Sequence, residues 1–409
     1  MTVRVKIAKT AKELDDVFHL RHQVYVKGEG VLKGIVSEES ETIFDRFDAL
    51  PPVGNIIAYS GNEPIGTMRI NLDAGVGLPP DDSSDFTAYR ERIVEQWMRT
   101  HSSPPQFGSA GMLAIRSDWR NRRDVIHALL KMGAGVGRTW GGTHIIATPS
   151  SRTAAMYIRL GFEVLGEKIW IDEFGDYIQP VAGTFEDFYN WTFGGLMENE
   201  RFLLAFATRF QRVILGKGET LFKEGDSGRE AYIIDTGTIR VSRTTSGEQG
   251  ESTLAMLGRG DLFGELSLID AKPRSANVTA LTNVELIALD REDFMCGLKE
   301  DPTHMEDMLE LFAARIRRTD ELIAVMQGSG TQRMDHALED IRNSAVPDRK
   351  RPNMLLAKVG LADFARNAGV SKSEAKLYLD MKKEMGVIEH NEYRIWFTVA
   401  AKPNDKSDK

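Results

Sequence analysis

The hydrophobic positions in the first part of the chain alternate between two spacings. Apolar residues at every second position predict β-strands, and apolar residues at a spacing of 3.6 positions predict helices. Because both spacings alternate here, the pattern indicates a mixed α and β domain. A hairpin is expected around Gly61 and Asn62, between apolar runs at 55–60 and 64–71. The other signals are a helix over 124–139, a buried strand over 143–148, and loops at 75–84 and 101–105.

The spacing changes in the middle of the chain. From residue 213 to 289, short apolar runs are separated by glycines, which predicts a small β-barrel or roll. A helix is expected before it, over 198–212, and a longer one after it, over 291–327, with an apolar stripe. Gly328 and Gly330 would end that helix. The last part of the chain is expected to be mostly helical with a short β end.

Composition narrows the class of protein. Of the 409 residues, 42% are hydrophobic and 27% are charged, which is the ordinary balance of a globular protein. The sequence lacks an apolar run long enough for a membrane span and the apolar core of a signal peptide, so neither is expected. Cys296 is the single cysteine, which excludes an intrachain disulfide and favours the cytoplasm.

The charge is unevenly distributed along the chain. The net charge of −8 argues against a protein that coats nucleic acid generally. Residues 331–409 nevertheless contain 15 Lys and Arg against 12 Asp and Glu, a charge of +3, so the preceding part carries −11. A basic C-terminal section on an acidic body is compatible with local contact to DNA.

The segment 263–278 contains the groups that a cyclic nucleotide needs. Gly264 and Glu265 precede a short apolar helical turn, and Arg274 follows Glu265 by nine residues. A guanidinium and free backbone N–H groups suit the phosphodiester anion, whereas a carboxylate accepts a hydrogen bond from the ribose 2′-hydroxyl. The alternative is that Glu265 and Arg274 only pair with each other in a barrel that binds no nucleotide.

Residues 218–241 and 263–278 closely resemble cyclic-nucleotide-binding domains. The resemblance implies that Glu265 binds the ribose and Arg274 the phosphate. It also implies that the backbone near Gly264 and Leu266, and the hydroxyl of Ser275, complete the phosphate cradle.

The serine that follows Arg274 resembles the bacterial Crp type, which implies cAMP as the effector and leaves cGMP open. In Crp-type proteins the long helix after the barrel forms a homodimer and contacts the base. Thr319 stands at the base-contact position, and the alternative is an ordinary exposed threonine.

Residues 361–386 fit a helix, a turn and a second helix. Gly369 would end the first helix, Ser371 would cap the second, and 387–399 would form a β wing. This pattern resembles the winged helix-turn-helix of Crp-type regulators, whose second helix enters the major groove of DNA. The candidate groove residues are Lys372, Ser373 and Lys376. The alternative is a winged helix used for packing or dimerisation, because the usual base-reading side chains are not reproduced in order and Glu374 would lie near phosphates.

Residues 111–130 and 154–166 resemble the GNAT acyltransferase fold, in which N–H groups at a helix start hold the pyrophosphate of acyl-CoA. Three arginines, Arg120, Arg122 and Arg123, replace the usual glycines of that loop. The segments 20–30, 44–48 and 66–70 resemble more narrowly the acyl-homoserine-lactone and N-acyl amino acid synthases, and this resemblance covers most of residues 1–190. These enzymes take acyl chains from acyl carrier protein, an acidic partner that the three arginines could contact.

Acyl transfer from a thioester to an amine needs a base, an oxyanion donor and an acid for the leaving thiolate. By resemblance Tyr157 is the candidate acid, and the alternative is a packing tyrosine. The residues that could orient an amino-acid-like acceptor are Arg21, Asp45, Asp48 and Arg69. The alternative is that these four residues form only a structural ion-pair network. The eight histidines show no metal-ligand spacing, so no metal is expected.

The expected architecture is multidomain α+β. It comprises a GNAT-like domain over 1–190, a cyclic-nucleotide-binding β-roll over 191–300, a dimerisation helix over 301–330, a winged helix-turn-helix over 331–400 and a disordered tail over 401–409. The main hypothesis is a cytoplasmic N-acyltransferase that a cyclic nucleotide regulates, with acyl-CoA or acyl carrier protein as donor. The alternatives are a Crp-type transcription regulator with a non-catalytic acyl-ligand sensor, and a cAMP-regulated protein lysine acetyltransferase.

Overall fold

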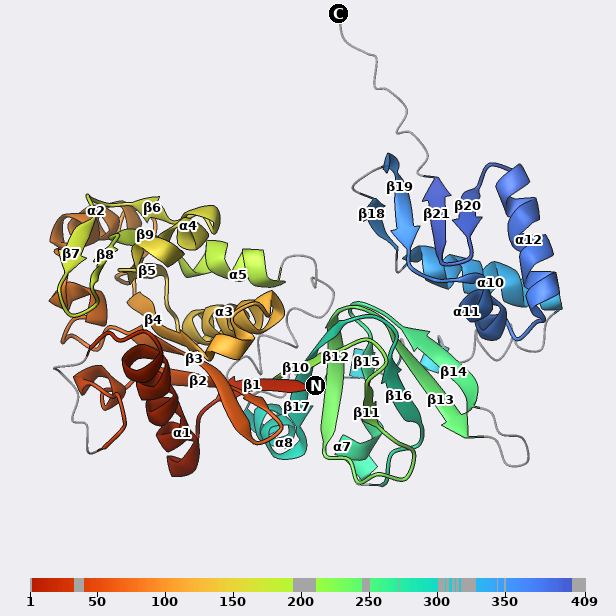
Figure 1. Cartoon of the computed structure of the whole chain (residues 1–409), viewed down its shortest axis with the longest axis horizontal. Coiled ribbons are helices and arrows are strands. Elements are labelled where there is room, and N and C mark those ends of the chain that lie inside the picture. The colour runs from red at the N-terminus through yellow and green to blue at the C-terminus, as the bar shows by residue number, and fades with distance from the viewer. Residues whose placement is uncertain are drawn as a thin grey trace, which may run out of the picture.

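The computed structural model contains helices and sheets in three consecutive sections of the chain (Figure 1). It describes residues 2–32, 40–193, 211–244, 251–270, 272–300, 329–343, 345–348 and 351–398, with the single residues 306, 309, 310, 313, 316 and 317. Within these ranges, no helix has both the length and the apolar character needed to cross a lipid bilayer.

The N-terminal section mixes strands and helices. Its strands are β1 (Val3–Ile7), β2 (Val53–Ser60), β3 (Glu63–Leu72), β4 (Phe107–Ile115), β5 (His144–Ala147), β6 (Glu163–Val164), β7 (Ile169–Ile171), β8 (Asp176–Ile178) and β9 (Val181–Thr184). Its α-helices are α1 (Ala11–His22), α2 (Thr87–Trp97), α3 (Arg123–Thr139), α4 (Ser151–Arg159) and α5 (Phe185–Phe193). Short helical turns are η1 (Gln23–Gly28, a π-helix) and the 3₁₀ turns η2 (Arg46–Asp48), η3 (Pro79–Asp82) and η4 (Ser117–Trp119).

Local signals account for several of these elements. Gly61, at a φ of 61°, closes the predicted hairpin between β2 and β3. Helix α3 confirms the predicted helix over 124–139. Its Gly137 allows Phe185 of α5 to pack against it, because a Cβ atom there would lie 1.9 Å from the Phe185 ring.

The middle section consists of short strands separated by turns, as the glycine spacing predicts. The strands are β10 (Gln211–Leu215), β11 (Thr220–Phe222), β12 (Glu230–Thr236), β13 (Ile239–Thr244), β14 (Glu251–Leu257), β15 (Leu262–Phe263), β16 (Asn277–Ala280) and β17 (Val284–Asp290). Helix α7 (Leu266–Asp270) lies between β15 and β16, and α8 (Arg291–Glu300) follows β17.

The helix predicted over 198–212 is wrong at its C-terminal end. Gln211 and Arg212 belong to β10, and residues 198–210 lie outside the described part of the chain. Arg212 is fully buried, and its guanidinium donates to the carboxylates of Asp235 and Glu285. These contacts come from distant parts of the sequence, so the local pattern could not reveal them.

One sheet of eleven strands runs through the N-terminal and middle sections. Its order is β15-β12-β17-β10-β1-β2-β3-β4-β5-β9-β6. The two sections meet where β1 pairs antiparallel with β10, with Val3 opposite Ile214 and Val5 opposite Arg212. The hydrophobic core is shared as well, since one buried cluster includes Val5 and Leu129 together with Ile233 of the barrel. Figure 1 shows β1 and β10 side by side at this junction.

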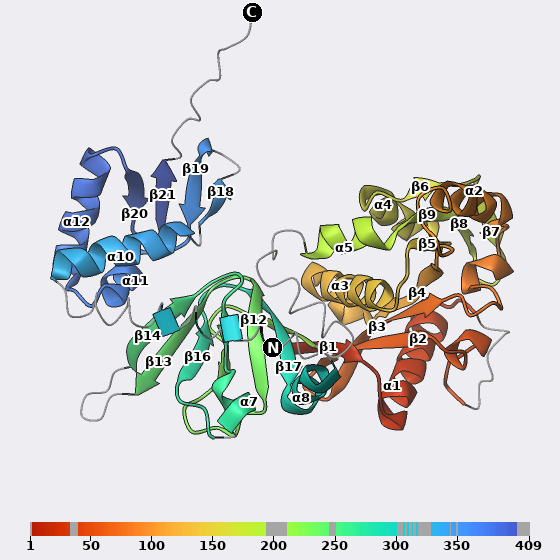
Figure 2. The same ribbon diagram turned by 180° about the vertical axis from the view of Figure 1, so that it is seen from behind.

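The C-terminal section has its own core and a four-stranded sheet ordered β18-β19-β21-β20. Its elements are α10 (Gly330–Asn343), β18 (Val346–Asp348), β19 (Arg351–Ala357), α11 (Leu361–Asn367), α12 (Lys372–Glu384), β20 (Ile388–Asn391) and β21 (Arg394–Thr398). Gly369, at a φ of 59°, follows α11, and the Ser371 hydroxyl accepts from the Glu374 N–H at the start of α12. Both capping predictions are thus confirmed. In both views this section lies beside β14, away from the N-terminal section (Figures 1 and 2).

Candidate functional sites

The segment predicted to bind a cyclic nucleotide forms the end of β15, helix α7 and the approach to β16. Gly264 has a φ of 74°, and a Cβ atom there would lie 2.8 Å from Nη1 of Arg274. A Cβ atom on Gly228 would lie 2.2 Å from Nε of the same arginine. Both glycines therefore leave room for the guanidinium of Arg274 inside the barrel wall.

Arg274 lies in a buried but polar environment. Its Nη1 donates to the carbonyl of Gly264 (2.9 Å) and to the hydroxyl of Ser267 (2.7 Å). The Phe222 ring centroid is 4.2 Å from its Cζ. Burial lowers the pKa of Arg274, although nearby Tyr232 acts in the opposite direction. Its buried Nε has no hydrogen-bond partner among the described residues, so the guanidinium retains capacity for an anion.

The other predicted cradle residues lie around the start of α7 and directly after Arg274 in the chain. Glu265 is 3% exposed, and Leu266 begins α7 with its side chain at the surface. Ser275 is exposed, and its carbonyl accepts from Nη2 of Arg243 at 2.8 Å. Thr319, predicted to contact the base, lies outside the described residues.

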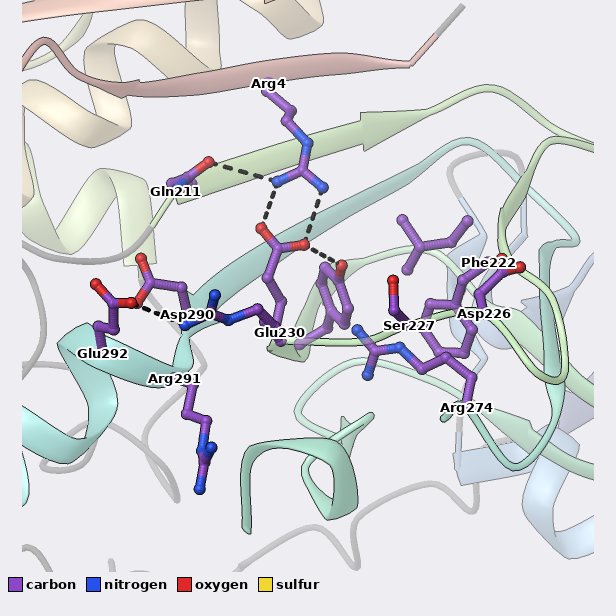
Figure 3. Close-up of a pocket in the computed structure, with 13 residues that line it drawn as sticks. Arg4, Gln211, Phe222, Asp226, Ser227, Glu230, Arg274, Asp290, Arg291 and Glu292 are labelled. Carbon is purple, nitrogen blue, oxygen red and sulfur yellow. Dashed lines mark hydrogen bonds and ion pairs between the residues drawn. The ribbon is translucent and has the colours of Figure 1, made fainter. Parts of the chain in front are cut away.

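An open pocket of about 570 Å³ lies where the barrel meets the N-terminal section (Figure 3). Arg274, Tyr232 and Glu230 line it from the barrel, and Arg4 reaches it from β1. Sequence reasoning missed Arg4, because a lone arginine in a short strand carries no local signal of a contact across more than two hundred residues.

The four residues predicted to orient an acceptor form one network in the N-terminal section. Nη1 of Arg69 donates to Asp45 (2.7 Å) and to Asp48 (2.8 Å), and Nη1 of Arg21 donates to Asp48 (3.0 Å). Burial alone would raise the pKa of Asp48, but Arg21 and Arg69 bring that pKa below its ordinary value. Only Asp45 has appreciable side-chain exposure in this network, at 35%, so an acceptor could approach the network at that carboxylate.

Tyr157 lies on α4 and is 4% exposed. Its ring packs edge-on against Phe162 with the centroids 5.3 Å apart. Burial raises the pKa of Tyr157 to about 12. In this arrangement the tyrosine is a packing residue, and an acid role would require the substrate to reach its hydroxyl within the core.

The three arginines of the predicted donor loop lie around the start of α3. Arg120 donates to Glu29 at 2.8 Å, and Arg122 donates to Asp124 at 2.7 Å. Arg123 is exposed at the first position of the helix. The loop therefore presents positive charge at the surface, although two of its guanidinium groups already have carboxylate partners.

The candidate DNA residues Lys372, Ser373 and Lys376 are exposed in the first turns of α12. Glu374 serves the capping box instead, with its carboxylate accepting from the Ser371 N–H at 2.9 Å. An apolar row continues the exposed side of α12. It consists of Leu377, Met381 and Met385, which are 75%, 43% and 65% exposed. Their four-residue spacing was visible in the sequence, but the prediction considered only the polar residues.

A buried charged cluster joins α3 to the barrel, and sequence reasoning missed it too. Lys131 of α3 donates to Asp235 of β12 (2.7 Å) and to Glu285 of β17 (2.8 Å). Arg212 donates to the same two carboxylates, which balances two positive charges against two negative ones. Among the described residues, no group of three or more acidic, histidine or cysteine side chains could hold a metal ion.

Comparisons with known proteins give two family matches. Residues 16–182 match the model of the N-acyl amino acid synthase FeeM family, and residues 212–301 match the model of the cyclic nucleotide-binding domain.

Individual relatives match the second half of the chain. The cyclic AMP receptor protein of Thermus thermophilus is 33% identical over 180 residues, which cover 44% of this chain and 80% of that protein. The CRP-like cAMP-activated global transcriptional regulator of Mycobacterium tuberculosis is 33% identical over 122 residues, which cover 30% of this chain and 54% of that protein. The chain thus spans about half the length of the mycobacterial relative.

Among solved structures, the catabolite activator protein of Thermus thermophilus is 32% identical, with 51% of this chain and 94% of that chain covered and a TM-score of 0.28. The family assignment therefore rests on the sequence identity and the matched domain models. The chain belongs to the cyclic AMP receptor protein family, and it carries an N-acyl amino acid synthase FeeM domain ahead of its cyclic-nucleotide-binding domain.

Proposed function

We propose that the protein is an N-acyltransferase whose rate is set by a cyclic nucleotide, with cAMP as the favoured effector. The observation that carries this proposal is the junction between β1 and β10. This junction places the FeeM-type section and the cyclic-nucleotide-binding section in one sheet and one core. Two sections that share a core cannot change shape independently, so a ligand that favours one arrangement of the barrel biases the other section as well.

The effector site is proposed at Arg274. Its guanidinium is suited to the phosphodiester, and Glu265 is suited to the ribose hydroxyl. Gly264, Leu266 and Ser275 would complete the cradle around the phosphate. The printed names of the Thermus and mycobacterial relatives both refer to cAMP, and these relatives are matched over 80% and 54% of their length, against 14% for a human cGMP-dependent protein kinase, which favours cAMP and keeps cGMP as the alternative.

The proposed reaction moves an acyl group from a thioester to an amine. The amine nitrogen attacks the thioester carbonyl, the C–N bond forms, the C–S bond breaks, and the proton lost by the amine ends on the leaving thiol. The donor is acyl-CoA or acyl carrier protein, held in a GNAT-like fold near Arg120, Arg122 and Arg123. Asp45, backed by Arg69, is the candidate contact for the amine acceptor, because its carboxylate has the most side-chain exposure in the buried network.

Tyr157 is proposed as the proton donor to the leaving thiolate. Its pKa of about 12 lies above that of an ordinary thiol, so Tyr157 can protonate the leaving thiolate only where the same core also desolvates the thiolate and raises the pKa of the thiol, and the proton lost by the amine must then return to Tyr157. The role therefore requires the reacting thioester to lie within hydrogen-bond reach of the Tyr157 hydroxyl.

The test is a thiol-release assay on the full chain, with acyl-CoA and acyl carrier protein thioesters as donors and a panel of amino acids as acceptors. We expect release that depends on the acceptor and changes when cAMP is added. Arg274→Ala should keep turnover but respond only at cAMP concentrations about 10- to 100-fold higher. Arg99→Ala, which removes an exposed arginine of the N-terminal section paired with Glu95 at 2.6 Å, should behave as the wild type. No release with either donor would refute the proposal.

The second candidate is a Crp-type transcription regulator with a homodimeric winged helix-turn-helix. The observation in its favour is the exposed start of α12, with Lys372 and Lys376 on a correctly capped helix. DNA binding through these lysines predicts a steep loss of affinity with salt, and Lys372→Ala with Lys376→Ala should reduce that salt slope by about two. The exposed apolar row on the same helix counts against a groove-binding surface.

A further inference from the structure

We propose that the nucleotide signal reaches the N-terminal section through β1, by a relay of four side chains at the junction pocket. The relay consists of Arg274, Tyr232, Glu230 and Arg4 (Figure 3). This inference rests on the regulated function proposed above and specifies the contacts that carry the regulation.

The barrel end of the relay is built from Arg274 and Tyr232. Cζ of Arg274 lies 5.6 Å from the centroid of the Tyr232 ring. The Tyr232 hydroxyl in turn donates to Oε2 of Glu230. Tyr232 is only 3% exposed, so its ring cannot follow a displaced guanidinium without moving the β12 residues around it.

The far end of the relay crosses from the barrel to β1. Nη1 and Nη2 of Arg4 donate to the two carboxylate oxygens of Glu230, at 2.6 and 2.9 Å. This bidentate geometry holds the carboxylate and the guanidinium in one plane. Figure 3 shows Arg4 pointing from β1 towards Glu230, with the guanidinium of Arg274 farther from Arg4 than Glu230 is.

Strand β1 is well placed to pass the signal on. Side chains alternate along it, so Val3 and Val5 lie in the buried cores while Arg4 faces the pocket. The strand pairs with β10 on one side and with β2 on the other. A change in how firmly Arg4 is held therefore acts on a strand that belongs to the core of the FeeM-type section.

The charges around Glu230 determine whether nucleotide binding tightens or loosens the contact between Arg4 and Glu230. Glu230 faces two guanidinium groups, because Arg4 binds it directly and the positive charge of Arg274 acts on it from behind Tyr232. A phosphodiester that binds Arg274 neutralises the second of these charges. Arg4 is then the guanidinium that still attracts Glu230, which keeps its hydrogen bond from Tyr232, so the Arg4–Glu230 pair tightens and β1 is fixed more firmly to the barrel.

Among the described residues, the sections are also joined by ion pairs that do not involve the relay residues. Lys9 pairs with Asp293 of α8 at 3.2 Å, and Lys131 pairs with Asp235 and Glu285. Lys9→Met is therefore a matched control, since it removes a junction ion pair that has no contact with Arg274 or Tyr232.

The test measures hydrogen exchange of the β1 amides in the full chain, with and without saturating cAMP, and the affinity for cAMP by calorimetry. In the wild type and in Lys9→Met we expect cAMP to slow exchange in β1 by about fivefold or more, the range of ordinary coupling energies. In Glu230→Gln and in Arg4→Met, which still bind cAMP, that difference should fall below about twofold.

The readout does not depend on turnover, so the two proposals can fail separately. If the chain releases no thiol but shows this exchange pattern, the relay proposal stands and the acyltransferase proposal is refuted. The relay is overturned if cAMP binds the wild type without slowing β1, or if Glu230→Gln and Arg4→Met both respond as fully as Lys9→Met does.

Discussion

Replacing Lys131 with methionine removes one positive charge from the buried cluster between α3 and the barrel. The remaining Arg212 then faces two carboxylates, Asp235 and Glu285, in a site that has little access to water. Methionine retains most of the packing volume of lysine. The substitution therefore isolates the loss of charge and of the two hydrogen bonds that Lys131 donates.

The expected cost follows from burial. Breaking a buried ion pair by removing one partner costs about 3–5 kcal/mol, and the 13% exposure of the Lys131 side chain favours the lower end, about 3 kcal/mol. With about 2 °C lost per kcal/mol in a large domain, the melting temperature should fall by about 6 °C. The control is Lys12→Met, because Lys12 is 81% exposed and pairs with Asp16 at the surface, where a pair contributes at most about 1 kcal/mol.

The assay is calorimetric unfolding of the full chain. Because the N-terminal section and the barrel share one sheet and one core, Lys131→Met should lower a single transition that contains both. Adding Glu285→Gln should recover part of the loss, since the double variant again balances one positive charge against one negative charge. The reasoning is refuted if Lys131→Met melts like Lys12→Met, or if the two sections unfold in separate transitions of which only one shifts.

Three further predictions follow from single side chains. Arg274→Ala should weaken cAMP binding by about 10- to 100-fold by calorimetry, the effect of losing a charged hydrogen-bond donor, whereas equal loss in the exposed-arginine control Arg99→Ala would contradict the assigned site. Burial alone would raise the pKa of Glu13, but Lys6 and the cap of α1 lower that pKa to about 2. The ionised Glu13 therefore stabilises the fold above the unfolded-state pKa near 4.5, and this stabilisation is lost as the pH falls towards 2. The difference in unfolding free energy between the wild type and Glu13→Gln should shrink over that window, and a constant difference would contradict this. Tyr157→Phe should lower kcat by about 100-fold with little change in melting temperature if its hydroxyl donates the proton, and an unchanged kcat would leave it as a packing residue.

The parts of the fold that the sequence predicted are those with local causes. The hairpin at Gly61, helix α3, the end of α11 at Gly369 and the cap of α12 at Ser371 each depend on residues a few positions apart. The cyclic-nucleotide segment was also recognisable, because Gly264, Glu265 and Arg274 lie within eleven residues.

The features that escaped prediction depend on contacts across long sequence separations. The pairing of β1 with β10 joins residues more than two hundred positions apart, and no hydrophobic period reveals such a partner. Arg212 was assigned to a helix because its role as a buried cation depends on Asp235, Glu285 and Lys131, which meet only in the folded chain. Arg4 escaped for the same reason, although it forms the bidentate contact between the two sections.

The most direct test of regulated acyl transfer is a titration of cAMP in which the rate of thiol release and the fraction of bound cAMP are measured on the same full-length protein. The account predicts that the rate changes along the binding curve, with one midpoint for both signals, and that Arg274→Ala shifts the two midpoints together. A rate that stays constant while cAMP saturates the barrel would contradict it.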